Sequence, residues 1–204
     1  MKGLLLKDYY TLLKQVRFYL IFLLIFTIIP NMNLSSIAIV YAAMLPITVI
    51  AFDERSKWDQ LAAMMPYTER ELVLSKYVLG YIAVAVFGVV AFALQSGIAL
   101  IGHHAFTMEQ GMALLVTAAA AMILLAINLP FMFWLGVERG RIVFMILIGV
   151  TVFLGMMSAD SAKELIANNT MTAAQLLLLC GAAAIVTNAI SIFASFKIYQ
   201  KKKG

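Results

Sequence analysis

The chain has 204 residues, of which 64% are hydrophobic and 12% charged, and its formal net charge is +5. A soluble domain of this length cannot bury so much apolar surface, so the composition predicts an integral membrane protein and excludes a soluble globular one. The single cysteine, Cys180, excludes an intrachain disulfide.

Long apolar runs predict six transmembrane helices, because each run is near the 20 residues that cross a bilayer. The predicted spans are 18–34, 36–52, 78–101, 112–134, 142–158 and 176–196. Helices are expected because hydrocarbon offers no partner for unpaired backbone groups. The predicted fold is therefore all-α, with one polytopic membrane domain over 1–204. Pro46 lies inside the second run and should kink or break that helix.

The segment 1–17 precedes the first span and combines leucines, tyrosines and basic residues. This composition predicts an amphipathic helix in the membrane interface, since aromatic and basic side chains favour the headgroup layer. A plain cytoplasmic leader is the alternative.

The basic residues predict the orientation of the chain. With both termini in the cytoplasm, 14 of the 15 basic residues lie on the cytoplasmic side and only Lys163 lies outside. The 14 are Lys2, Lys7, Lys14, Arg17, Arg55, Lys57, Arg70, Lys76, Arg139, Arg141, Lys197, Lys201, Lys202 and Lys203. The positive net charge therefore indicates topology and gives no support for nucleic-acid binding.

The longest charged segment, 53–76, joins spans 2 and 3. Its first half predicts a short helix in which Trp58, Leu61, Ala62 and Met65 recur at helical spacing and form one apolar stripe. Pro66 should end this helix. An amphipathic cytoplasmic helix of this kind suits either lipid headgroups or a protein partner, and its pattern leaves both open.

The second half of this segment contains a helix start signal. Thr68 and Glu71 have the T-x-x-E spacing of a capping box, so we expect them to begin the helix that becomes span 3.

Two other polar segments are less informative. Residues 137–141 predict a tight cytoplasmic turn between spans 4 and 5, and residues 159–175 predict a short outer helix or loop. His103 and His104 are adjacent on an outer loop without a third ligand at helical spacing, so we expect solvation and no metal.

The spans lack the side chains that membrane enzymes and ion-driven pumps require. None has Asp, Glu, Lys, Arg or His in its central part, and the chain has no Walker A motif. We therefore expect no catalytic residues, no metal and no cofactor in this chain. Gln95, Asn128 and Asn188 are polar and intramembrane. They suit either hydrogen bonds between helices or contacts along a path for an amphipathic substrate.

Two stretches of sequence support a family resemblance. The start MKGLLLKDYYTLLKQ and the run FDERSKWDQLAAMMPYTERELVLSKY resemble the permeases of ABC-2 type exporters, with the detail concentrated in 1–15 and 52–80. Among them, the chain looks most like the permeases that export phenol-soluble modulins. Permeases for bacitracin or lantibiotic resistance, or for lipid export, are the alternatives.

The resemblance implies several roles. Residues 1–17 would be a connecting helix, and the loop after span 2 would be a coupling helix docked on a separate ATPase, which would bind ATP and Mg²⁺. By position, the coupling residues would be Glu54, Arg55, Lys57, Trp58, Asp59, Leu61 and Met65. Two ATPase subunits and two permeases, identical or related, would assemble in a bacterial plasma membrane. The expected cargo is a cytotoxic amphipathic peptide.

Overall fold

A computed structural model describes residues 2–15, 34–101, 108–147 and 173–203, with single positions at 17, 21, 25, 149, 150 and 153. These residues form helices and the turns between them, so the predicted all-α class is confirmed for the described chain. The helices are α1 (Lys2–Gln15), α3 (Leu34–Ala42), α4 (Leu45–Arg55), α5 (Trp58–Ala63), α6 (Glu69–Ile101), α7 (Met108–Leu135) and α9 (Ala173–Lys203). Residues 137–147 are helical as well.

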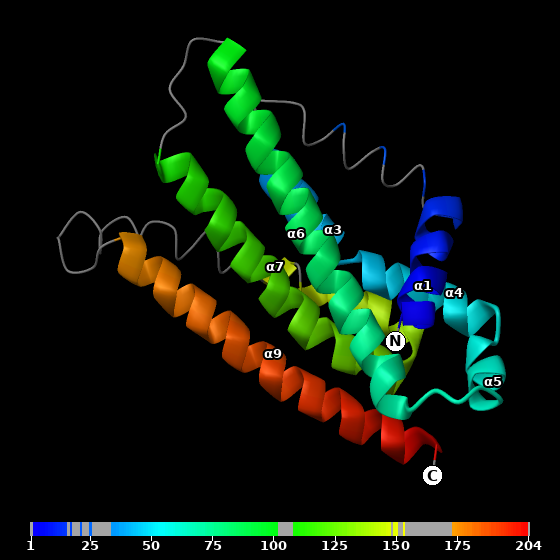
Figure 1. Ribbon diagram of the computed structural model, residues 1–204. Coiled ribbons are helices and arrows are strands. Elements are labelled where there is room, and N and C mark those ends of the chain that lie inside the picture. Colours follow the sequence, from blue (N-terminus) through cyan, green and yellow to red (C-terminus); the bar gives the residue numbers. More distant parts are fainter. Residues whose placement is uncertain are drawn as a thin grey trace.

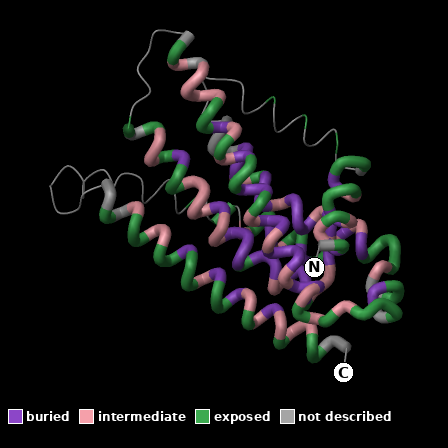
Figure 2. The backbone as a smooth tube through the Cα atoms, in the orientation of Figure 1, coloured by how far each residue is buried: buried purple, intermediate pink, exposed green. Residues whose placement is uncertain are grey.

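Three helices form the long part of the molecule. α6, α7 and α9 pack against one another, and α1, α4 and α5 gather near one end of this bundle (Figure 1). Buried residues concentrate where α3, α4, α6 and α7 meet (Figure 2). Tyr77, Ile39 and Leu125 are the largest side chains of this core and are almost fully buried.

Three stretches are long and apolar enough to cross a membrane: Glu69–Gly97, Gln110–Leu135 and Leu177–Lys201. They correspond to the predicted spans 78–101, 112–134 and 176–196. The first predicted span, 18–34, and most of the fifth, 142–158, lie outside the described residues. The prediction of six spans therefore rests on the sequence alone, whereas three are supported by continuous helices.

The second predicted span is two short helices, α3 and α4, separated by a turn at residues 43–44. Pro46 lies in the first turn of α4, where its missing N–H is not needed. The predicted break at this proline is confirmed. The break has a direct cause, because proline cannot donate the backbone hydrogen bond that a continuous helix over 36–52 would require.

The predicted capping box begins α6. The Thr68 amide donates to Glu71 Oε2 at 3.2 Å, and the Glu71 amide donates back to Thr68 Oγ1 at 3.3 Å. Both bonds satisfy amides that have no acceptor within the helix. α6 consequently starts at Glu69, as the capping box predicts, and it precedes the predicted apolar span at 78–101 without a break.

Gly80 allows α6 to lie close to α4 and α7. A Cβ at this position would lie 2.1 Å from Leu125 Cδ1 and 3.0 Å from Pro46 Cγ. Leu125 is nearly fully buried, and the proline ring is rigid, so neither atom has free space to move into. The absence of a side chain at Gly80 therefore allows α6 to approach both α4 and α7 closely.

We predict that Gly80→Ala destabilises the protein, because overpacking a buried contact costs about 1–3 kcal/mol. Thermal unfolding in detergent would report this as a lower Tm. Gly88→Ala is a matched control on the same helix, since a Cβ there meets no atom within 4 Å. Alanine favours helices over glycine, so the Tm of this control should stay equal or rise. Equal Tm losses for the two variants would contradict the close approach.

Candidate functional site

α5 lies at the edge of the molecule, between α4 and α6 (Figure 1). The chain turns from α4 into α5 at Lys57, whose φ of 53° is in the left-handed region. This conformation is unfavourable for most residues other than glycine, and here it bends the chain sharply between α4 and α5. α5 is therefore a separate short helix set off from α4 by a sharp bend.

The apolar side chains of α5 divide between two faces. Ala62 is 2% exposed and packs with Leu4 and Leu72, and Trp58 packs against the same cluster. Leu61 and Met65 are 50% and 40% exposed, so the predicted stripe does not form a single exposed surface. Leu4 and Leu72 cover only the side of α5 that carries Ala62 and Trp58, which leaves Leu61 exposed, and Met65 lies beyond the end of the helix at Ala63.

The exposed side chains form what we call the outer edge: Leu61, Met64 and Met65. Met64, which the predicted stripe did not include, is 85% exposed. The sequence indicated its exposure only through its position beside Met65, just before Pro66.

The remaining predicted coupling residues have different surroundings. Glu54, Arg55 and Lys57 are exposed. Glu54 Oε2 accepts a hydrogen bond from the Val137 amide at 3.0 Å, which ties the end of α4 to the segment after α7. Asp59 lies within α5, and its side chain is outside the described part of the structure.

The predicted turn at 137–141 is wrong, because these residues form the first turn of a helix. Gly136 alone makes the bend after α7, with a φ of 77° that suits glycine. The first helical bond runs from the Gly140 amide to the Gly136 carbonyl, and Glu54 supplies an acceptor to the exposed helix start. A carboxylate at this position also interacts favourably with the helix dipole.

A cluster of four charges holds α1 against α4 and α6. Lys76 Nζ lies 2.9 Å from both carboxylate oxygens of Asp8 and 2.6 Å from Asp53 Oδ2. Lys7 bridges the same two acids and lies 4.4 Å from the centroid of the Trp58 ring. We call Lys7, Asp8, Asp53 and Lys76 the charge quartet. Its two acids and two bases balance, and Asp8 is 0% exposed.

The quartet was not predicted. Lys7 and Lys76 were interpreted only as markers of the cytoplasmic side. Their acidic partners are distant in sequence, since 68 residues separate Asp8 from Lys76.

A cavity of about 280 Å³ lies beside the quartet. Its charged lining residues are Asp53, Glu54 and Lys76. Trp58 borders it from α5, and Met132 and Phe133 border it from α7. The inner face of α5 therefore lies over a partly apolar space at this end of the bundle.

We predict that Lys76→Met strongly destabilises the protein, because it leaves a buried excess of negative charge. Removing one partner of a buried pair costs about 3–5 kcal/mol. The second substitution Asp8→Asn restores neutrality and should recover much of the loss. Chemical unfolding in detergent would measure both effects. Lys14→Met, on the exposed side of α1, is the matched control and should have little effect. A double variant no more stable than Lys76→Met would contradict charge balance as the cause.

Within the bundle, polar side chains join α6 to α9 and α7. Tyr77 Oη lies 2.6 Å from Ser191 Oγ and 2.8 Å from Ser195 Oγ. Ser191 also donates to the Ala126 carbonyl of α7. These side chains satisfy one another between apolar helices, where hydrogen bonds compensate for the missing hydrophobic driving force.

Asn188 of α9 also forms hydrogen bonds with α6 and α7. Its side chain accepts from Tyr81 Oη at 2.7 Å and donates to the carbonyls of Ala184 and Met122 at 2.7 and 3.3 Å. Of the two readings left open by the sequence, this geometry favours hydrogen bonding between helices at Asn188.

The other two predicted path residues differ from Asn188. Asn128 is 0% exposed, and among the described residues neither of its side-chain polar atoms has a hydrogen-bond partner. Gln95 is half-buried on α6. In the part that the structure describes, Asn128 therefore forms no side-chain hydrogen bond with Gln95 or Asn188.

Within the described residues, no cluster of three or more His, Cys, Asp or Glu side chains is arranged to hold a metal ion. At this end of the bundle, α5 is packed against α1 and α6 on its inner face and exposes the apolar outer edge on the opposite face.

Comparison with protein families gives a match over residues 3–200 to the ABC-2 family transporter protein model. The chain belongs to the ABC-2 transporter family. It is a multi-pass membrane protein and the permease of an ABC-2 type transporter. Permeases of ABC transporters generally pair with a separate ATPase subunit and are typically not catalytic themselves. Neither the curated proteins nor the solved structures contain a match.

Proposed function

We propose that this ABC-2 permease exports an amphipathic peptide across a bacterial plasma membrane and is driven by a separate ATPase that docks on α5. The outer edge is the observation that carries the docking part. Leu61, Met64 and Met65 are apolar, 50%, 85% and 40% exposed, and lie among charged residues. A small apolar centre with a polar rim is the usual composition of a protein interface.

The inner face of α5 supports docking mechanically. Trp58 and Ala62 pack against the bundle, so the outer edge is presented on a helix that is already fixed. A rigid apolar edge loses little conformational entropy on binding. In this proposal Arg55, Lys57 and Asp59 belong to the polar rim, whereas Trp58 and Glu54 hold the helix in place.

We predict that Leu61→Gln combined with Met65→Gln weakens ATPase binding by about tenfold, which corresponds to about 1.4 kcal/mol. Co-purification of the ATPase subunit with the tagged permease would measure the loss. Trp58 is left unchanged, so the support of α5 remains.

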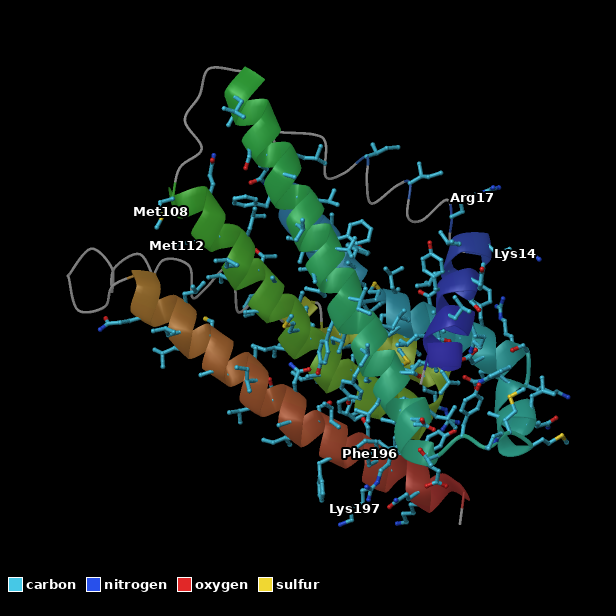
Figure 3. All side chains as sticks on the ribbon, in the orientation of Figure 1. Lys14, Arg17, Met108, Met112, Phe196 and Lys197 are labelled. Carbon is cyan, nitrogen blue, oxygen red and sulfur yellow. The ribbon has the colours of Figure 1, made fainter. Side chains whose placement is uncertain are left out.

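Met108→Gln is the control for this experiment. Met108 is 79% exposed and lies on α7 at the end far from α5 (Figure 3). This variant should retain the ATPase at the wild-type level. Retention of the ATPase by the Leu61 and Met65 double variant would place the docking surface elsewhere.

The cargo part of the proposal rests on the chemistry of the spans. The central parts of α6, α7 and α9 carry no Asp, Glu, Lys, Arg or His, so a strongly hydrated solute would meet a high desolvation cost between them. An amphipathic peptide can keep its apolar face against lipid or apolar side chains. Asn128 is buried and has no side-chain hydrogen-bond partner among the described residues, so it could contact the polar face of such a cargo only if the helices separate during transport. Among these peptides, phenol-soluble modulins suit the family resemblance best.

The assembly that we propose contains two ATPase subunits and two permeases. Both termini of this chain lie in the cytoplasm, as the distribution of basic residues predicts. ATP and Mg²⁺ belong to the ATPase subunits.

We predict that membrane-active amphipathic peptides stimulate the ATPase activity of the reconstituted permease–ATPase complex, because the cargo enters from the bilayer. Stimulation should appear at the peptide concentrations that give membrane binding. A scrambled peptide of equal charge and composition, without an apolar face, is the control. Stimulation by a small hydrophilic solute, with every amphipathic peptide inactive, would contradict the proposed cargo class.

A further inference from the structure

A second cleft lies where α4 ends and the helix over residues 137–147 begins. Its volume is about 390 Å³. Its lining consists of Ala51, Glu54, Arg55, Leu135, Gly136, Val137, Glu138, Arg139 and Arg141. Glu54 and Arg55 of the predicted coupling segment form one side of this cleft. Neither the outer edge of α5 nor the predicted path residues border it, and the proposed export function gives no role to Arg139 and Arg141 on its other side.

The cleft carries three guanidinium groups, from Arg55, Arg139 and Arg141. All three are exposed, and none forms an ion pair in the part of the chain that the structure describes. The lining also includes two carboxylates. Glu54 is occupied by the Val137 amide, and Glu138 is exposed beside the arginines. The excess of one positive charge and the fork-shaped donors favour an anion such as phosphate.

The neighbouring side chains place this cleft at the membrane surface. Trp134, next to Leu135 of the lining, is 64% exposed, and tryptophan favours the headgroup layer. Beyond Arg141 the exposed residues become apolar: Ile142, Met145 and Ile146 are 62%, 75% and 60% exposed. An exposed face that changes from charged to apolar within one helical turn marks the boundary between headgroups and hydrocarbon.

We propose that this cleft binds the phosphate group of an anionic phospholipid, with Arg139 and Arg141 as its main donors. The lipid's acyl chains then lie along the exposed apolar face that starts at Ile142. A soluble phosphate compound would use only the charged half of this arrangement. A lipid uses both halves, because headgroup and acyl chains meet at the same boundary as the arginines and the apolar face.

The test measures lipid preference without ATPase or transport. The permease in detergent, supplied with equal amounts of phosphatidylglycerol and phosphatidylcholine, would be analysed by native mass spectrometry for bound lipid. The wild type should retain phosphatidylglycerol preferentially. Arg139→Gln combined with Arg141→Gln should weaken that preference by about thirtyfold, the effect of two basic residues near an anionic surface.

The control is Arg70→Gln combined with Lys197→Gln. It removes the same charge from exposed residues that do not line the cleft, and Figure 3 shows Lys197 on α9 near the end of the bundle. Its preference for phosphatidylglycerol should remain within about threefold of the wild type.

Three outcomes would overturn the proposal. The first is an equal loss of preference in the two double variants. The second is competition by glycerol 1-phosphate as strong as that by the intact lipid, which would assign the cleft to a soluble phosphate. The third combines unchanged lipid preference in the Arg139 and Arg141 double variant with loss of the ATPase in a separate co-purification, which would assign the arginines to the protein partner.

Discussion

The structure depends most on the balance of four charges in its interior. Asp8 is 0% exposed, and a carboxylate in such a place is tolerable only with compensating charge and hydrogen bonds. Lys76 supplies both from α6, and Asp53 and Lys7 complete the neutral group. Because no member can move away without leaving a buried charge, the quartet specifies how α1, α4 and α6 lie relative to one another. Its main effect is therefore on geometry, since well-paired buried charges add little net stability over apolar residues.

A different constraint operates further along the helices. Apolar side chains gain nothing by leaving lipid for another apolar surface, so α9 needs directional contacts to hold its position. The bonds of Ser191, Ser195 and Asn188 supply them, and each side chain reaches α6 or α7. Small side chains at Ala121 and Ala184, both buried, let the backbones approach closely enough for these bonds to form.

Features encoded by neighbouring residues were predictable from the sequence. The long apolar runs, the break at Pro46 and the Thr68–Glu71 capping box each depend on a few adjacent positions, and the structure has all three. Features that depend on residues far apart in the sequence were not predictable. The partners Asp8 and Lys76 lie 68 residues apart, and no local pattern distinguishes a lysine that pairs inside the protein from one that marks topology. The two faces of α5 were unpredictable for the same reason, because its inner face is defined by Leu4 and Leu72 of other helices.

The last turn of α4 connects these constraints. Asp53 and Glu54 are consecutive, so their side chains point about 100° apart around the helix axis. Asp53 joins the quartet, and Glu54 binds the amide that starts the helix after α7. The residues immediately before α5 are thus bonded to α1 and α6 on one side and to the continuation of α7 on the other. A load applied to α5 reaches both groups of helices through charged or charge-assisted bonds, which are stronger than neutral hydrogen bonds. In the proposed exporter, a movement of the ATPase would pass through this turn to α1 and α6 and, separately, to the helix that follows α7.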